Sequence, residues 1–218
     1  EFRRVLFRSA DFNDPDVLEL MNSDLPVVTI DYVHHNCTAV SSNNIQGMED
    51  LVKYIYGQGH RKIAYIHGQQ ASYVTKDRLA SFYRTVDELG LKIPDEYIRT
   101  ADYLETREAA KQTKELLNLE DPPTCIIYPD DTSLIGGRNV IIEMGLRIPR
   151  DISIAGYDGT RMSQLLHPQL TTIRQDTELI GSEAAKRLIG SIEKPRTTLV
   201  ERVVIEGILV AGKSVGRI

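Results

Sequence analysis

The sequence has little of several features that would point directly to a function. Only two of its 218 residues are cysteines, Cys37 and Cys125; they are far apart and match no metal or redox spacing, which indicates core residues in a reducing compartment. No apolar run is long enough to cross a bilayer, and no secretory signal is visible. Acidic residues outnumber basic ones, 31 to 26, giving a net charge of −5. We therefore expect no membrane partner and no nucleic-acid surface within these residues.

The remaining composition is that of an ordinary soluble globular protein. Hydrophobic residues make up 41% and charged residues 26%, and the length suits one large domain or two lobes. The opening EFRRVLFRS differs from the rest of the chain, since Glu-Phe is encoded by a common restriction site and VLFRS by the end of a common sequencing adapter. We interpret residues 1–10 as a cloning or sequence-assembly artefact and leave them out of the fold prediction.

From Asp11 onward, helical and extended apolar patterns alternate along the chain, separated by Gly-, Pro- and Asp-rich breaks. Helices are predicted over 15–22, 44–57, 76–89, 106–117, 132–144 and 177–193, and strands over 26–31, 62–68, 97–101, 124–131, 152–158, 170–176 and 199–207. Alternating elements of these lengths favour an α/β fold, with mostly parallel sheet covered by helices on both faces.

Acidic residues follow several of the predicted strands. Asp31 follows VVTI, Asp130 and Asp131 follow CIIYP, and Asp158 follows ISIAGY. Ligands of open α/β sheets bind beyond the carboxyl ends of the strands, so these acids are candidates for a shared site. Asp also caps helices, and we assign that role to Asp131, before a helix starting near Thr132. The alternative that GYDG is only a tight turn stays open at this point.

Six motifs carry a resemblance to a known family. In chain order they are GHRKIAYIHG (59–68), DRLASF (77–82), PTCIIYPDD (123–131), RIPRDISIAGYDG (147–159), HPQLTTIRQD (167–176) and the closing SVGRI. They resemble the effector-binding core of the lactose/galactose repressor (LacI/GalR) family of bacterial transcription regulators, and they follow that family's order. The resemblance runs from about Leu25 to the C-terminus.

The resemblance implies a two-lobed, periplasmic-binding-protein-like fold, in which each lobe is a mostly parallel sheet flanked by helices. It implies an incomplete N-terminal lobe made of 11–43 and 176–207, and a C-terminal lobe made of 44–175 and 208–218. Family members begin with a helix-turn-helix DNA-binding domain and a hinge helix, which we expect to be missing before Asp11. Operator DNA is then a partner only through that missing domain.

The family's effector contacts fall on six residues of this sequence. They are Asp31 after the first strand, Arg78 of an R-x-x-G-F-like motif, Tyr103 after an acid, Asp130 where relatives often carry Asn, Asp158 of the G-Y-D motif, and Gln175 after L-T-T-I. Ala80-Ser81 stands where the family usually has Gly before the aromatic residue, and we expect this departure to affect helix packing rather than binding.

These residue types suit a small neutral carbohydrate. Carboxylates accept hydrogen bonds from hydroxyl groups, the guanidinium of Arg78 supplies a fixed fork of donors, and Tyr103 offers a flat face to a sugar ring. One arginine among three acids suits a polyol better than an anion. We expect Arg78 to lie in the cleft and not to be a packed core group, so that Arg78→Ala removes binding with little change in stability.

Other polar residues have more ordinary interpretations. His34 and His35 could bind a metal, but adjacent histidines of an extended chain point apart and no third ligand is near. His60 follows a predicted helix end, where a capping role is expected. Gly136 and Gly137 lie within a predicted helix and form no phosphate loop, and no nucleophile elbow is present. We predict no catalytic residue, metal or cofactor.

The predicted function is effector sensing, by lobe closure, in a cytoplasmic transcriptional regulator. A periplasmic sugar-binding protein of a transporter is the alternative, because it shares the fold, and an enzyme of doubly wound fold is a third class without a catalytic constellation. The family resemblance and the two-fold symmetry of operator half-sites imply a homodimer, with candidate surfaces at 44–57, 70–90 and 132–145.

Overall fold

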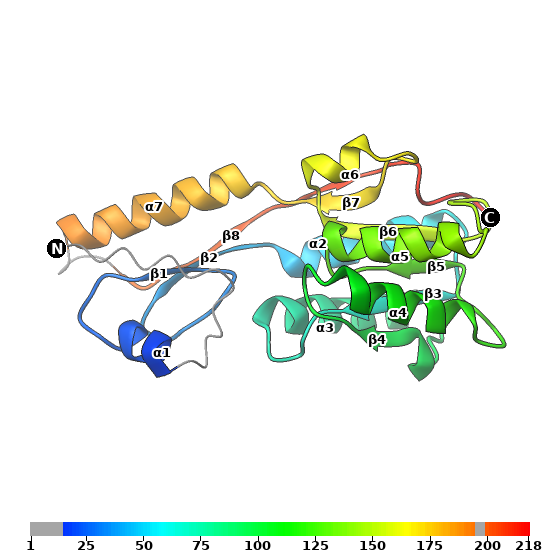
Figure 1. Ribbon diagram of the computed structural model, residues 1–218. Coiled ribbons are helices and arrows are strands. Elements are labelled where there is room, and N and C mark those ends of the chain that lie inside the picture. Colours follow the sequence, from blue (N-terminus) through cyan, green and yellow to red (C-terminus); the bar gives the residue numbers. More distant parts are fainter. Residues whose placement is uncertain (1–14, 195–198) are drawn as a thin grey trace. The chain divides into compact units, whose positions relative to one another are not determined.

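The computed structural model describes residues 15–194 and 199–218, and these form two compact α/β units (Figure 1). The first unit comprises the described residues up to Ser41 together with Thr177–Ile205. The second comprises Ser42–Asp176 together with Glu206–Ile218. Each unit is therefore built from separate stretches of the sequence.

The second unit is organised around a six-stranded sheet. Its strands are β3 (Ile63–His67), β4 (Ile98–Thr100), β5 (Cys125–Ile127), β6 (Ser153–Asp158), β7 (Thr171–Arg174) and β9 (Ile208–Val210), in the order β4-β3-β5-β6-β7-β9. The first five run parallel, and β9 joins β7 antiparallel. The carboxyl ends of β3, β5, β6 and β7 therefore meet at one edge of the sheet.

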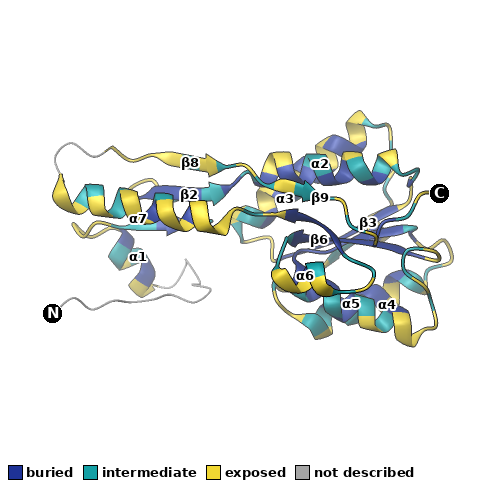
Figure 2. Cartoon of the chain, turned by 90° about the horizontal axis from the view of Figure 1, so that it is seen from above, coloured by how far each residue is buried: buried dark blue, intermediate teal, exposed yellow. Residues whose placement is uncertain are grey.

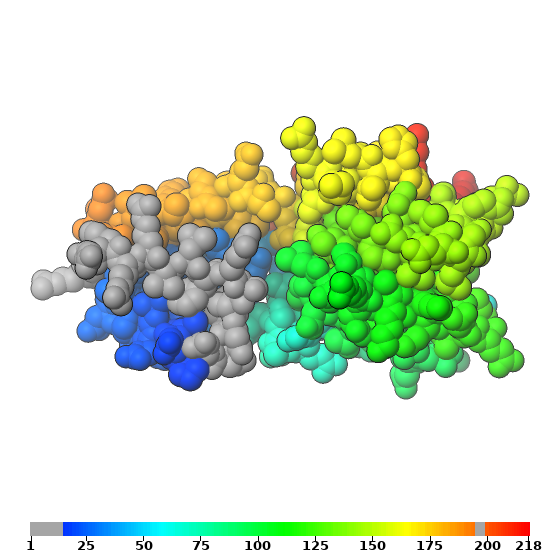
Figure 3. Space-filling view, viewed as in Figure 1, coloured from blue at the N-terminus to red at the C-terminus, as the bar shows by residue number. Residues whose placement is uncertain are grey.

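Helices cover both faces of this sheet. They are α2 (Asn44–Gly57), α3 (Tyr73–Glu88), α4 (Thr106–Leu117), α5 (Asp131–Glu143) and the short α6 (Arg161–Leu165), with a 3-10 turn at Asp95–Tyr97. Successive residues of β3 alternate between two cores, as a strand's period of two requires. Tyr65 packs with Phe82 of α3, whereas Ile66 packs with Leu116 of α4. Figure 3 shows α4 and α5, in green and yellow-green, at the surface of this unit.

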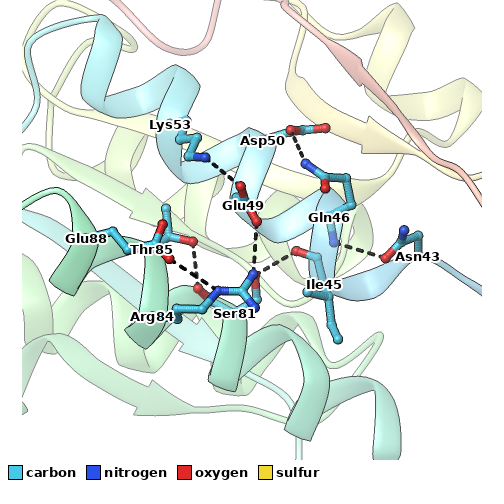
Figure 4. A network of polar contacts seen from close by, with 10 residues as sticks. All are labelled: Asn43, Ile45, Gln46, Glu49, Asp50, Lys53, Ser81, Arg84, Thr85 and Glu88. Carbon is cyan, nitrogen blue, oxygen red and sulfur yellow. Dashed lines mark hydrogen bonds and ion pairs between the residues drawn. The ribbon is translucent and has the colours of Figure 1, made fainter.

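Polar contacts join α2 to α3 on one face of the sheet (Figure 4). The Ser81 hydroxyl donates to the Ile45 carbonyl at 2.7 Å, and Arg84 donates to Glu49 at 2.9 Å, while Glu49 also pairs with Lys53. Ser81 is buried at this helix contact. Ser81 thus lies at the contact between α2 and α3, and its effect on helix packing stays a prediction.

Close approach of α4 and α5 depends on the glycine pair of α5. A Cβ on Gly136 would overlap the backbone of Thr106, and a Cβ on Gly137 would overlap the hydroxyl of Tyr128. That hydroxyl is itself hydrogen-bonded to Thr113 of α4 at 2.7 Å. The pair lies within a helix, as predicted, and its small size lets α4 and β5 approach.

The first unit has a smaller core. Its elements are α1 (Pro15–Met21), β1 (Val28–Ile30), β2 (Thr38–Ser42), α7 (Thr177–Glu193) and β8 (Arg202–Ile205), with sheet order β1-β2-β8. Val40 of β2 packs against Ile180 and Ala184 of α7, while Val204 is exposed. Figure 2 shows buried residues, in dark blue, on β2 and α1 of this unit.

The predicted alternation of strands and helices is confirmed, and the helices 106–117 and 177–193 begin and end where the sequence places them. The sequence did not predict β2, β9, α6 or the 3-10 turn at Asp95–Tyr97. Strand β5 ends at Ile127, earlier than the predicted 131, because Asp130 leaves the strand to cap α5. Along residues 15–194 and 199–218, no helix combines the length and apolarity needed to span a bilayer.

Candidate functional site

Five of the six predicted site residues lie in the second unit. Asp130, Asp158 and Gln175 stand at or just after the ends of β5, β6 and β7, and Arg78 and Tyr103 lie on elements that follow β3 and β4. A helix that follows a parallel strand begins at that strand's carboxyl end, so α3 brings Arg78 to the same edge. The sixth, Asp31, follows β1 in the first unit with φ +57°, and it is described apart from the others.

Arg78 is buried, with 3% of its surface exposed. Its Nε donates to Asn44 Oδ1 at 2.8 Å and a terminal nitrogen donates to the Pro129 carbonyl at 2.9 Å. Its guanidinium carbon lies 3.4 Å from the centroid of the Tyr157 ring. The expectation that Arg78 is not a packed group was wrong, because neutral groups from α2, β6 and the segment after β5 enclose this arginine. Asn44 and Tyr157 are therefore supporting residues that the sequence alone did not reveal.

Asp158, the last residue of β6, adopts a left-handed backbone conformation, with φ +101°. Gln175 holds it twice: its Nε2 donates to Asp158 Oδ1 at 2.6 Å, and its backbone N–H donates to the Asp158 carbonyl at 3.1 Å. Burial raises the pKa of Asp158 to about 7; Arg78 opposes this shift, and Asp130 and Asp131 add to it. Strained conformations of this kind gather at functional sites.

The capping role predicted for Asp131 belongs to Asp130. Asp130 is the N-cap of α5, because its extended backbone, φ −157° and ψ 166°, lets Oδ1 accept from the N–H groups of Thr132 and Ser133. Its Oδ2 accepts from the Leu104 N–H at 3.0 Å and the Ser133 hydroxyl at 2.7 Å. Capping by Asp131 was thus a wrong prediction, since Asp131 is already the first helical residue.

Tyr103 lies between β4 and α4, beside the segment that Asp130 holds. Its hydroxyl is 2.8 Å from the hydroxyl of Thr75 on α3, and burial raises its pKa. Gly68, just after β3, leaves room for the ring, because a Cβ there would overlap it. The ring is thus fixed at the carboxyl end of β3.

His60 does not cap a helix, contrary to expectation. The C-cap of α2 is Gln58, and the buried His60 ring lies 2.9 Å from the Thr124 hydroxyl and 3.0 Å from the Gly216 carbonyl. The ring therefore ties the C-terminal segment to the start of β5. The rings of His34 and His35 do not point apart as predicted, since their centroids are 4.3 Å apart and their planes are tilted by 41°. Residues 15–194 and 199–218 hold no metal-ligating cluster of three or more.

The arrangement combines fixed donors with fixed acceptors at one sheet edge. Arg78 supplies guanidinium N–H groups, Asp158 a carboxylate, Gln175 an amide, and Tyr103 an aromatic ring. The opposite charges of Arg78 and Asp158 interact. Such a set can hold a polar small molecule and orient it.

Comparison with known proteins shows which family the chain resembles. Residues 52–215 match the family model described as a periplasmic binding protein-like domain. The HTH-type transcriptional repressor PurR of Aliivibrio salmonicida is 31% identical over 192 residues, which cover 87% of this chain and 57% of that repressor. The chain thus spans somewhat over half the length of the curated relatives it matches first, at 58% and 57%.

Two solved structures extend the likeness to three dimensions. A LacI transcriptional regulator from a Rhodococcus species superposes with a TM-score of 0.84 at 26% identity, over 92% of this chain and 74% of that one. The transcriptional regulator CelR, solved with cellobiose, superposes with a TM-score of 0.76 at 26% identity, over 81% of this chain and 54% of that one. The chain belongs to the periplasmic binding protein-like domain family, in the form that LacI-family transcriptional regulators carry.

Proposed function

We propose that this chain is the effector-binding region of a transcriptional regulator, and that the carboxyl edge of its second sheet holds a small neutral carbohydrate. The observation that carries this proposal is that Arg78 and Asp158, whose opposite charges interact, are each held by neutral neighbours. Arg78 is held by Asn44 and the Pro129 carbonyl, and Asp158 is held by Gln175. A rigid donor beside a rigid acceptor suits vicinal hydroxyl groups, which donate and accept together.

The charge balance of the edge supports a neutral ligand over an anion. Burial lowers the pKa of Arg78 and the negative charge of Asp158 raises it, while burial raises the pKa of Asp158 and the positive charge of Arg78 lowers it. Each charge therefore offsets part of the cost of burying the other. A buried anion would need further cations, because an unpaired buried charge is costly. The cellobiose bound by CelR is a neutral sugar of the expected class.

Each contact has its own role in this proposal. Arg78 donates to ring or hydroxyl oxygens, Asp158 and Gln175 exchange hydrogen bonds with hydroxyls, and Tyr103 faces the C–H surface of the sugar. Asp31 stays a predicted contact on the first unit. Asp130 is assigned a supporting role, because its four hydrogen bonds occupy the capacity of its carboxylate.

The wider activity follows from the relatives and is proposed on that basis. PurR is named as an HTH-type repressor, so we propose that the whole regulator binds operator DNA in the cytoplasm as a homodimer. In this proposal the first unit represents the N-terminal lobe and the second the C-terminal lobe, and the two close on the effector. A periplasmic transport protein is not favoured, because the matched curated relatives are repressors.

Isothermal titration calorimetry with a sugar panel tests the proposal. The panel contains cellobiose, D-glucose and D-ribose, together with two anionic analogues, glucose 6-phosphate and glucuronate. We expect at least one neutral sugar to bind, more tightly than either anion, and Asp158→Asn to weaken that binding. Binding of the anions alone would contradict the proposal, and so would undiminished sugar binding by Asp158→Asn.

A further inference from the structure

Asp131 is a buried acid whose contacts lead away from the helix that it begins. Its side chain is 1% exposed and lies at the start of α5. Oδ2 accepts from the Thr160 N–H at 2.7 Å and from the Thr160 hydroxyl at 3.2 Å, and Oδ1 accepts from the Thr172 hydroxyl at 2.8 Å. One carboxylate thus joins α5 to the turn after β6 and to β7.

These contacts enclose the turn that carries Asp158. The Thr172 hydroxyl, while donating to Asp131, also accepts from the Gly159 N–H at 3.2 Å. The N–H groups of both residues that follow Asp158 are therefore bonded to Asp131 or to its partner Thr172. Gly159 is itself left-handed, with φ +65°. Glycine adopts this conformation without strain, whereas the left-handed Asp158 needs surroundings that fix it, and this network supplies them.

A glycine of β6, Gly156, leaves room for the Asp131 carboxylate. A Cβ on Gly156 in β6 would stand 2.5 Å from Asp131 Oδ1. Burial raises the pKa of Asp131, and its hydrogen bonds from Thr172 and Thr160 oppose that shift. A buried carboxylate accepting several hydrogen bonds is stabilised only if its donors stay in place, so the donors and the acid fix one another.

We propose that Asp131 is a positioning residue for ligand binding, which holds the left-handed turn at Asp158 through Thr160 and Thr172 and so aims the Asp158 carboxylate. It does not itself contact the ligand. This inference rests on the proposed function, since it names what orients one of the proposed sugar contacts. It gives the second acid of the Asp130–Asp131 pair a role different from that of its neighbour, which caps α5.

Three variants test the network and one controls for stability. Asp131→Asn replaces an acceptor oxygen with an amide donor, which then faces a donor of Thr160 or Thr172. Thr172→Val removes the shared hydroxyl, and Thr172→Ser keeps it. Ser214→Ala is the matched control, because the Ser214 hydroxyl bonds the Ile154 carbonyl at 2.6 Å and the Thr171 N–H at 2.8 Å on the same strands, away from the turn.

The first measurement is affinity for the panel sugar that the wild type binds best. We expect Asp131→Asn and Thr172→Val each to raise Kd by about tenfold or more, as loss of a supporting hydrogen bond does at other binding sites. The double variant Asp131→Asn/Thr172→Val should have a Kd no higher than that of the weaker-binding single variant. Thr172→Ser should keep Kd within about threefold of the wild-type value. Ser214→Ala should leave Kd unchanged. Equal weakening in Thr172→Ser and Thr172→Val, or unchanged Kd in both Asp131→Asn and Thr172→Val, would overturn the inference.

The second measurement needs no ligand, so it separates this inference from the proposed function. Amide hydrogen exchange in the free protein reports the N–H groups of Gly159 and Thr160, which should exchange faster in Asp131→Asn and Thr172→Val than in Ser214→Ala. A wild type that binds no panel sugar would remove the proposed function, while faster exchange at these two amides would still support the positioning of the turn. Unchanged exchange at both amides would overturn the positioning itself. If Asp131→Asn does not fold, the Thr172 pair carries both measurements.

Discussion

At the scale of single residues, Arg78 shows how a charge is kept inside a site. The guanidinium rests on the Tyr157 ring and donates to two neutral oxygens, and Asp158 supplies the opposite charge. Burying a charge is costly unless it is hydrogen-bonded or paired, and here several groups share that task. The same contacts that aim the side chain also tie α3 to α2, to β6 and to the segment after β5.

Arg78→Ala is therefore expected to reduce stability as well as binding. The variant loses a buried cation–π contact and two hydrogen bonds and leaves Asn44 Oδ1 without its donor, a change worth roughly 2–4 kcal/mol of unfolding free energy. Urea denaturation measures this loss, and calorimetry with the best panel sugar measures the loss of affinity. A variant as stable as the wild type would contradict the buried geometry, and one with normal affinity would remove Arg78 from the site.

Asp158 gives stability a specific pH dependence. Its folded pKa of about 7 lies above the value of about 4 in an unfolded chain, so the folded protein binds this proton more tightly. The contribution of Asp158 to unfolding free energy is therefore greatest below about pH 4 and decreases as the pH rises towards 7.

Carbon-13 NMR of the side-chain carboxyls reads the pKa of Asp158 directly. We expect a titration midpoint near 7 for Asp158, and a midpoint near 2 for Asp151, whose hydrogen bonds with Arg147 lower its pKa, as an internal reference. In Asp158→Asn the signal titrating near 7 should be absent. A midpoint for Asp158 in the ordinary range of carboxyls, near 4, would show that the site is more open to water than the structure indicates.

At the scale of elements, the packing of α4 on α5 depends on the absence of a side chain. Gly136→Ala gains helix propensity of up to about 1 kcal/mol, yet its Cβ would overlap the Thr106 backbone. Backbone cannot rotate away as a side chain does, so we expect net destabilisation, by roughly 1–3 kcal/mol. The matched control is Gly181→Ala in α7, where a Cβ meets nothing within 4 Å.

Thermal denaturation of the two glycine variants distinguishes packing from propensity. Gly136→Ala should melt below the wild type, while Gly181→Ala should melt at the same temperature or higher, because only the propensity gain applies there. A rise in melting temperature for both variants would mean that α4 and α5 can separate without cost.

Much of the element order could be predicted from the sequence, because long helices such as α4 and α7 have a clear apolar period. Strand β2 could not, since TAVSS mixes polar and small residues, and its burial comes from α7 and β8, which are distant in sequence. The sequence could not decide either whether Asp130 or Asp131 caps α5. Both acids fit the capping pattern, and only the extended backbone of Asp130 decides between them.

The candidate site could be predicted from the sequence for a different reason. Asp158 and Gln175 stand at the ends of apolar strands, and parallel strands bring such ends together, so their proximity follows from the pattern. The burial of Arg78 does not follow from it, because Tyr157 and Asn44 reach it from other elements. Supporting residues are set by tertiary packing, which a single sequence does not display.

At the scale of the whole molecule, the apolar cores are unequally divided. The second unit has two large cores on the two faces of its sheet, whereas the first has two small clusters, around Cys37 and around Val40. Local opening free energy rises with buried apolar contact. We expect amide hydrogen exchange to be slower in β3, β5 and β6 than in β1 and β8. Equal protection of both sets of strands would contradict this division.

The most direct test of carbohydrate binding at this sheet edge is a crystal structure of the protein with the panel sugar that it binds best. We predict sugar hydroxyls within hydrogen-bond distance of Arg78, Asp158 and Gln175, with a C–H face of the ring against Tyr103. We also predict that Asp131 remains bonded to Thr160 and Thr172 and touches no sugar atom. A sugar bound away from the carboxyl edge of the second sheet, or held there without Arg78 and Asp158, would contradict the proposed site.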